Sequence, residues 1–233
     1  MKRMFLLAVV IATATLAQAQ ASFGVHANVI GASMKNKSDG QEINFDTRIS
    51  WKGGLVAQVP LTTNIYFQPQ LNLLSKGGKI DEQETMDFNG VPVTATVKGD
   101  AKLTYVELPL NLVYSTGGEE GGFFIGVGPS ISFGIGGKFK GDATASFGGQ
   151  SASEPFDADV KFDGKTDEEA NDDNIHYKSL DFGATALVGY QLPSGLFINA
   201  HYNYGFSNID PNSGGETKNR YFGIGIGYFF GRQ

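Results

Sequence analysis

Apolar and polar residues alternate at every second position along most of this chain. Between residues 122 and 136, odd positions such as Phe123, Ile125 and Val127 are apolar, and most even positions are glycine or serine. The same alternation recurs at residues 23–29, 46–59, 65–76, 101–114, 180–191, 196–207 and 222–230. A period of two indicates β-strands, and glycine at alternate positions would destabilise a helix. The pattern therefore predicts an all-β protein of about eight strands.

The connections between these segments are alternately short and long. Residues 60–64, 115–121 and 193–195 are short, whereas the polar segments near 35–45, 77–100, 137–177 and 209–217 are longer. This alternation is typical of outer-membrane barrels, which have tight periplasmic turns and extended extracellular loops. We therefore predict an eight-stranded antiparallel up-and-down transmembrane β-barrel, with the long segments as extracellular loops.

Periodicity alone does not say whether the apolar set of alternate positions (the apolar parity) or the polar set (the polar parity) faces outward. A soluble lipocalin-like barrel would turn its apolar parity inward. Three features favour a membrane barrel. The polar parity holds mostly Gly, Ser, Asn and Gln, which suit a crowded interior, and the chain ends in an alternating strand that resembles an outer-membrane insertion signal. Aromatic residues also lie near strand ends, where interfacial girdles form. The predicted girdle consists of Trp51, Tyr114, Phe123, Tyr190, Tyr228 and Phe230.

The first residues have the layout of a secretory signal peptide. A cationic start (residues 1–3) precedes an apolar stretch and the small residues Ala17 and Ala19. We predict a signal peptide over 1–19 and an outer-membrane barrel domain over 20–233. The chain has no cysteine and a net charge of −6, which argues against a disulfide framework and a nucleic-acid partner.

Glu107 falls on the polar parity of an otherwise apolar strand, together with Asn111. An eight-stranded barrel is just wide enough for its own side chains to fill it, and a buried carboxylate there must be paired or hydrogen-bonded. The predicted interior network comprises Glu107, Arg48, Lys52, Gln70, Asn111, Asp181, His26 and His201. We predict a charge-paired plug without a continuous pore, and a bulge or strand end at Pro109.

The segment Tyr105-Val106-Glu107-Leu108-Pro109-Leu110 resembles the outer-membrane β-barrel family typified by PorT. Residues 60–61 and 66–78 also resemble that family, and the likeness extends over about 21–230. The family is widespread in the Gram-negative Bacteroidota and is often described as porin-like. The resemblance implies the fold and the compartment. PorT itself serves the type IX secretion system, whereas many relatives have no assigned role.

Catalysis is not expected from this sequence. The chain has three histidines, of which His26 and His201 lie on the interior parity and His176 lies in a long loop. The loop at 137–177 is acidic, but a calcium-loop interpretation fails because Lys161 occupies a ligand position. We therefore predict no enzyme activity, cofactor or metal. The acidic loop is expected to be a solvated surface or a contact for a cationic or divalent-ion-bridged partner, including lipopolysaccharide.

Two functional classes stay open at this point. The first is a non-catalytic barrel with a surface, assembly or structural role, including a type IX secretion role like that of PorT. The second is a narrow channel or a porin-like transport barrel for small solutes or lipids. The expected partners are outer-membrane lipids, lipopolysaccharide, the barrel assembly machinery during insertion, and an envelope protein.

Overall fold

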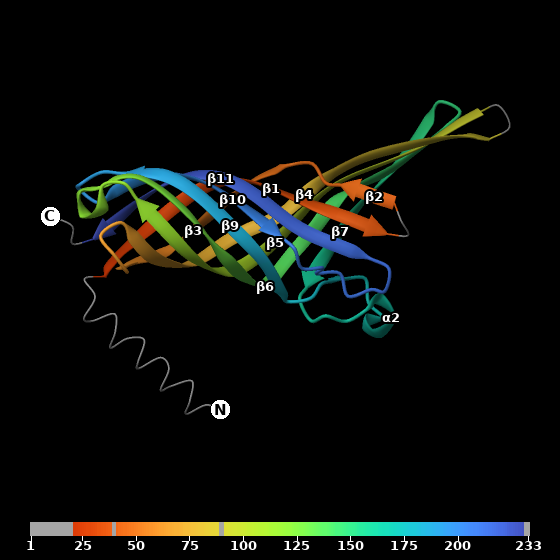
Figure 1. Ribbon diagram of the computed structural model, residues 1–233. Coiled ribbons are helices and arrows are strands. Elements are labelled where there is room, and N and C mark those ends of the chain that lie inside the picture. The colour runs from red at the N-terminus through yellow and green to blue at the C-terminus, as the bar shows by residue number, and fades with distance from the viewer. Residues whose placement is uncertain (1–20, 39–40, 89–90, 231–233) are drawn as a thin grey trace.

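Eight long strands form a closed antiparallel ring in the computed structural model (Figure 1), which describes residues 21–38, 41–88 and 91–230. The predicted signal peptide over 1–19 lies outside the described residues. The ring strands, in order, are β1 (Ser22–Ser38), β3 (Arg48–Pro60), β4 (Ile65–Phe88), β5 (Val91–Ser115), β6 (Gly122–Phe147), β9 (Leu180–Gln191), β10 (Leu196–Gly205) and β11 (Glu216–Phe230). Each pairs with the next, and β1 pairs with β11 to close the ring.

Smaller elements complete the fold. They are β2 (Gln41–Asn44), β7 (Gln150–Lys161), β8 (Ile175–His176), the one-turn helix α2 (Asp167–Ala170) and a 3₁₀ turn at Gly118–Glu120. Strand β2 pairs with β1, whereas β7 pairs with β6 and, at its end, with β8. Within the described ranges, no helix is long and apolar enough to cross a membrane.

Two of the segments that we expected to be loops are largely strands. Residues 77–100 belong to the β4–β5 hairpin, and residues 137–161 belong to β6 and β7. The expected loop at 35–45 likewise continues β1 and contains β2. Hydrophobic periodicity missed these strands because they alternate charged or hydroxyl residues with small ones. The sequence of 94–98, Thr-Ala-Thr-Val-Lys, is an example.

The ring strands β4, β5 and β6 continue beyond the ring and, together with β7, form a projecting sheet. We define the projecting sheet as residues 79–88, 91–100, 138–147 and 150–159, which pair antiparallel in the order β4–β5–β6–β7. Figure 1 shows this sheet extending away from the ring, at the end opposite the start of β1 and the end of β11. The molecule therefore has a projecting-sheet end and an opposite end, where Ser22 and Phe230 lie.

The apolar parity of the ring points outward. Val29, Ile125 and Ile224 expose 58%, 56% and 68% of their surface, whereas Glu107 and Asn111 are fully buried. Phe133, Val188 and Ile226 are exposed in the same way. A soluble barrel with an apolar interior would show the opposite pattern, so the lipocalin-like alternative is wrong.

The interior is layered, which the alternation did not predict. At the projecting-sheet end it holds an apolar cluster that includes Ile30, Met34, Leu74, Leu103 and Ile209. At the opposite end, buried apolar residues gather in two smaller groups: Val56, Phe197 and Phe229, and Tyr66, Val113 and Leu187, with Phe124 packed against both. Polar and charged side chains fill the middle layer between them. Apolar packing thus closes both ends of the polar layer.

Pro109 does not mark a bulge. It lies within β5 opposite Ser130, and the β5–β6 register is the same on both sides of it. The register shifts instead near Tyr105, where Thr104 faces Gly136 and Tyr105 faces Gly134. A proline lacks a backbone donor and can omit a ladder bond without an extra residue. The extra residue falls beside Gly136, whose positive φ of 153° suits glycine.

Candidate functional site

Four buried charged side chains meet in the middle layer of the ring. Lys52 Nζ lies 3.3 Å from Glu107 Oε1, and Lys76 Nζ lies 3.7 Å from Glu107 Oε2. Lys76 Nζ also lies 3.0 Å from Asp181 Oδ2. These residues come from β3, β4, β5 and β9, and each side chain is at most 3% exposed. Two cations and two anions balance, which a buried cluster requires because an unpaired charge there costs several kcal/mol.

Hydroxyl and amide groups surround this charge cluster. Tyr221 Oη donates to Glu107 Oε1 at 2.7 Å and accepts from Lys52 Nζ at 3.2 Å. Ser132 Oγ accepts from Lys76 Nζ at 2.9 Å and donates to Glu107 Oε2 at 3.3 Å. On the other side, Asn219 Nδ2 donates to Asp181 Oδ2 at 3.0 Å and to Tyr105 Oη at 3.3 Å. Lys76 Nζ also lies 4.7 Å from the centre of the Tyr105 ring, within cation–π range.

The structure brings together three of the predicted network residues, Glu107, Lys52 and Asp181, through Lys76. Arg48 instead pairs with Asp100, at a distance of 2.5 Å, where β3 begins. Gln70 donates to Gln68 and accepts from Asn72. These two residues therefore stabilise neighbouring parts of the ring and do not contact Glu107.

The remaining predicted residues lie around the cluster. His26 Nε2 is 2.8 Å from Asn72 Oδ1, and Asn28 Nδ2 donates to His26 Nδ1 at 2.7 Å. The His201 ring packs edge-on against Tyr221, with ring centres 5.7 Å apart. Asn111 is fully buried, and neither of its side-chain polar atoms has a hydrogen-bond partner within the described structure. Both histidines are thus held by amide or aromatic neighbours.

Sequence reasoning missed Lys76, Tyr221, Ser132, Asn219 and Tyr105. Lys76 stands directly before Gly77 and Gly78, which were read as the start of a loop. Its parity is the same as that of Asn72 and Leu74, and it is the last residue of the predicted strand 65–76, so parity alone would have placed it in the interior. Tyr221 was missed because the final alternating segment was started one residue after it.

Five of the six predicted girdle residues lie near the end of the ring opposite the projecting sheet. The Phe123 and Tyr190 rings pack edge-to-face with centres 4.9 Å apart, and those of Tyr228 and Phe230 are 5.7 Å apart. Tyr114 lies opposite Ile125 on the neighbouring strand. Trp51 is separate from them, because it is close to the start of β3 at the projecting-sheet end, opposite Val29. All six side chains are exposed.

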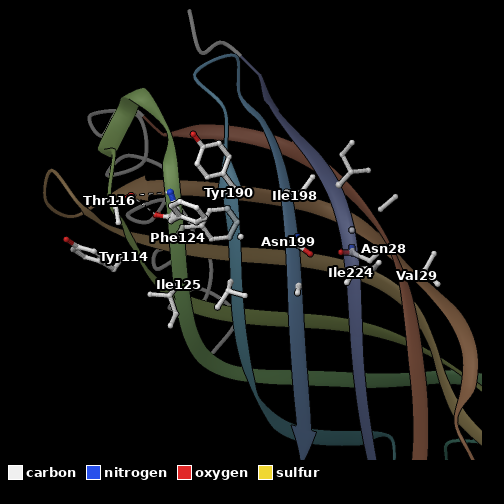
Figure 2. A pocket seen from close by; sticks show the side chains of 17 residues that line it. Asn28, Val29, Tyr114, Thr116, Phe124, Ile125, Tyr190, Ile198, Asn199 and Ile224 are labelled. Atoms are coloured by element: carbon white, nitrogen blue, oxygen red, sulfur yellow. Dashed lines mark hydrogen bonds between the residues drawn. The ribbon is translucent and has the colours of Figure 1, made fainter.

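A shallow apolar depression of about 1130 Å³ lies on the outer face of the ring, apart from the buried charges. Figure 2 shows Val29, Ile125, Ile198 and Ile224 around it, on strands β1, β6, β10 and β11. Small residues such as Ala27 and Ala200 lie between these larger side chains. Most of the large side chains that line the depression belong to the outward apolar surface.

A histidine between two carboxylates holds the acidic segment after β7. His176 Nδ1 lies 2.8 Å from Asp163 Oδ1, and its Nε2 lies 3.0 Å from Asp172 Oδ1. These bonds raise the pKa of His176 above its ordinary value, and bonds from His176 and Lys161 lower the pKa of Asp172. We call these three residues the His176 clasp. In the described part of the chain, no group of three His, Asp or Glu side chains is placed to hold a metal ion.

Comparison with known proteins identifies the family. Residues 16–210 match the family described as "Outer membrane protein beta-barrel domain". No curated protein matches the chain in sequence.

Solved structures with a similar strand arrangement share little sequence with this chain. The attachment invasion locus protein Ail of Yersinia pestis is 14% identical, with 91% of this chain and 99% of that chain covered and a TM-score of 0.39. Neisserial surface protein A (NspA) is 13% identical, with 89% and 97% covered and a TM-score of 0.42.

Proposed function

This chain belongs to the outer membrane protein β-barrel domain family, and from that premise we propose that it is a non-catalytic, eight-stranded transmembrane barrel that acts through its projecting sheet. In this proposal the ring crosses the bacterial outer membrane. The projecting sheet lies outside the cell, and the end with Ser22 and Phe230 faces the periplasm. The proposal rests on one main observation: a four-stranded sheet extends beyond a ring whose interior is closed.

The outward surface of the ring supports the membrane assignment. Exposed apolar side chains follow each ring strand, and aromatic residues gather near the proposed periplasmic end, as membrane interfaces require. In water, an apolar surface of this extent would cause aggregation. Acyl chains would cover it, including the depression in Figure 2.

The closed interior supports a non-conducting role over the alternative, a narrow channel or transport barrel. The charge cluster around Glu107 is fully buried, and apolar groups pack on both sides of it. Reconstitution in planar bilayers tests this point. We expect no steady conductance at neutral pH, and a stable open level in the purified protein would favour the channel.

The projecting sheet has the features of a recognition surface. Its inner face continues the interior parity and exposes Met86, Val97 and Phe147 by 62%, 36% and 53%. Glu82, Glu84 and Glu154 occupy the same face, whereas Lys98, Lys138 and Lys140 occupy the other face. An apolar surface with carboxylates and without these lysines suits a protein segment that carries apolar and basic side chains.

The edges of this sheet are also available in the described structure. Between Gln150 and Asp159, β7 pairs with β6 alone, and β4 pairs with β5 alone beyond Lys79. Unpaired edge groups can accept a further strand. The proposed partner is therefore an envelope or extracellular protein that binds the inner face or an edge of the projecting sheet.

Paired substitutions on the two faces test this role. Val97→Glu with Phe147→Glu changes the inner face, and Thr96→Glu with Ser146→Glu is the matched control on the same strands. Cells with each variant would be crosslinked, and the adducts identified by mass spectrometry. We expect a partner that is captured by the wild type and the control and lost from the inner-face variant. Equal capture by both variants would contradict the proposal.

A type IX secretion role like that of PorT is the finer form of this proposal. Its support is the resemblance at Tyr105–Leu110. Tyr105 and Glu107 of that motif contact Asn219, Tyr221 and Lys52 inside the ring, which makes the motif a requirement of the fold. Deletion of the gene followed by an assay of type IX cargo secretion separates a secretion role from a general surface role.

A further inference from the structure

The inner face of the projecting sheet has an apolar centre between two acidic sides. In the register of the four strands, one row of this face reads, from β4 to β7, Glu82, Val97, Ala143 and Glu154. The next row toward the hairpin turns reads Glu84, Ala95, Ala145 and Ala152. The charged residues of both rows therefore lie only on the two outer strands. We call the four central residues the apolar band: Val97, Ala143, Ala95 and Ala145.

The apolar surface continues on both sides of this band along β5 and β6. Toward the ring, aromatic rings cover two glycines: a Cβ on Gly141 would lie 2.6 Å from the Phe156 ring, and a Cβ on Gly99 would lie 2.9 Å from the Phe139 ring. The centres of these two rings are 5.1 Å apart. Toward the hairpin turns, the next row reads Met86, Val93, Phe147 and Gln150. Small residues thus lie between rows of larger apolar ones.

The two faces of the sheet differ in how their charges are balanced. On the outer face, Lys98 lies 3.2 Å from Asp81, and Lys140 lies 2.6 Å from Asp157. On the inner face, three exposed carboxylates have no lysine, arginine or histidine at ion-pair distance within the described ranges: Glu82, Glu84 and Glu154. The unpaired negative charge of the sheet therefore flanks its apolar surface.

The distance between the two acidic sides suits an α-helix. Adjacent strands lie about 4.8 Å apart, so β4 and β7 are separated by roughly 14 Å across β5 and β6. An α-helix with its side chains is about 10–12 Å across. A helix that lies along β5 and β6 would therefore cover the apolar band, with each of its flanks beside glutamates. The projecting part of β5 spans about 33 Å, which is the length of a helix of roughly 22 residues.

We propose that the inner face of the projecting sheet binds an amphipathic α-helix of a partner protein. The apolar side of the helix packs on the apolar band, and lysine or arginine residues on both of its flanks pair with Glu82, Glu84 and Glu154. Burial of apolar surface stabilises the complex, and charge complementarity fixes the position of the helix. This inference rests on the proposed function and adds the shape and the charge of the partner.

The same charges disfavour other occupants of this face. A symmetric contact with a second copy of the chain would bring two copies of one surface together. That contact would place carboxylates beside carboxylates without a basic residue to pair with them. An anionic lipid surface would be repelled for the same reason, whereas a basic helix gains from every carboxylate that it covers.

Single cysteines can report on each face, because the chain has none of its own. Ala152→Cys places a fluorescent label beside the apolar band, and Ser153→Cys places the label on the outer face of the same strand. The full chain in phosphatidylcholine nanodiscs would be titrated with a designed helix of about 22 residues, with a leucine stripe and lysines on both flanks. Empty nanodiscs correct for peptide bound to lipid. We expect a saturable signal from the inner label and none from the outer label. Equal signals from both labels would overturn the site.

Charge variants test the acidic sides. The inner-face variant combines Glu82→Gln, Glu84→Gln and Glu154→Gln. We expect its affinity for the peptide to fall about tenfold, because three ion pairs with the peptide are lost. The matched control removes as many negative charges from the outer face and should bind as the wild type does; it combines Asp142→Asn, Asp157→Asn and Asp159→Asn. Equal weakening of both variants would reduce the effect to general attraction and overturn the assignment of the glutamates.

Other peptides distinguish a helix from the remaining occupants. A peptide of alternating valine and lysine forms a strand, which would pair with the free edge of β7. Tighter binding of this peptide than of the helical one would overturn the helix. A helix of the same composition with its leucines scattered should bind at least tenfold more weakly, and equal binding would have the same consequence. A signal from the inner label that grows with protein concentration alone would assign the face to a second copy.

A measurement on the wild type covers the case in which the variants do not fold. The ¹³C carbonyl resonances of the helical peptide should show bound helix beyond that found with empty nanodiscs, and their absence would contradict the inference. If the peptide does not bind but Val97→Glu with Phe147→Glu still loses the crosslinked partner, this inference alone fails. If that variant also captures the partner as its control does, the proposed function fails as well.

Discussion

The interior charge cluster and the ion pairs of the projecting sheet use the same kinds of residue in two environments. Lys52, Lys76, Glu107 and Asp181 are almost fully buried. Lys138, Lys140, Asp157 and Asp159 are about half exposed on the outer face of the sheet. The distances are similar, at 3.0 Å for both Lys76–Asp181 and Lys138–Asp159. Solvent and neighbouring groups therefore distinguish the two regions more than geometry does.

Removal of one partner of an ion pair should therefore have different results in the two regions. In the interior, the remaining charge would be buried without compensation, which costs several kcal/mol. On the projecting sheet, water would solvate the remaining charge, and exposed pairs contribute little to stability.

Glu107→Ala should give the largest loss of stability. It leaves Lys52 and Lys76 with the single buried counter-charge of Asp181, so we expect a loss of roughly 3–5 kcal/mol in the free energy of unfolding, or failure to fold. Urea titration in lipid vesicles would measure it. The control is Glu154→Ala on the projecting sheet, which should unfold with the wild type. A loss under 1 kcal/mol for Glu107→Ala would remove the distinction between the two regions.

Tyr221→Phe should have the next largest effect. The hydroxyl lies between Lys52 and Glu107 and is bonded to both, whereas the ring keeps its packing in the variant. Loss of these buried bonds should cost about 1–3 kcal/mol, measured in the same titration. Tyr202→Phe, which changes an exposed outward tyrosine, is the matched control. An unchanged midpoint for Tyr221→Phe would show that the cluster does not need the hydroxyl.

The environment of the His176 clasp is intermediate between the buried interior and the exposed projecting sheet, because a buried imidazole ring contacts two carboxylates at the surface. Since the pKa of His176 is raised in the folded state, its contribution to stability is complete below its ordinary value of 6.5 and is lost as pH rises through the raised pKa. The pKa values of Asp163 and Asp172 are lowered in the folded state. The contribution of these carboxylates to stability is therefore complete above their ordinary value of 3.8 and is lost as pH falls through the lowered pKa values.

Hydrogen exchange of residues 162–179 as a function of pH would test the clasp. We expect protection to be greatest below pH 6.5 and to fall as pH rises through the raised pKa of His176. His176→Gln should remove this fall while leaving exchange in the ring strands unchanged. A loss of protection with rising pH in His176→Gln equal to that of the wild type would rule out the histidine as its origin.

Asp157→Asn should have the smallest effect. The carboxylate lies near Lys138 and Lys140 on an exposed face, so the remaining lysines can be solvated. The urea midpoint should match that of the wild type within error, and addition of salt should not separate the two curves. A loss comparable to that of Tyr221→Phe would show that the projecting sheet depends on its ion pairs as the interior does.

The ring could be predicted because its strands are apolar on one face. Phe133, Val188 and Ile226 mark that face in the sequence and are exposed outward in the structure. The pairing of Lys52 with Glu107 was also accessible, since an interior carboxylate needs a cation and few lysines share its parity. Arg48 met the same criterion but pairs with Asp100, because parity does not specify depth along the ring.

The projecting sheet and the apolar ends of the interior could not be predicted in this way. A sheet outside the ring needs no apolar face, so residues such as Thr94, Thr96 and Lys98 gave no hydrophobic signal. Leu74 and Leu103 were counted simply as strand residues, although they form part of an apolar layer. The position of these residues along the ring axis follows only from the register between neighbouring strands.

The pairing of Phe23 with Phe230 has a consequence for biogenesis. The first and last strands are neighbours, so the ring cannot close until nearly the entire polypeptide has been made and delivered. Closure over such a separation carries a large chain-entropy cost and slows folding. Until that moment β1 and β11 each present an unpaired edge, and a chaperone or an assembly catalyst has its greatest opportunity to act there.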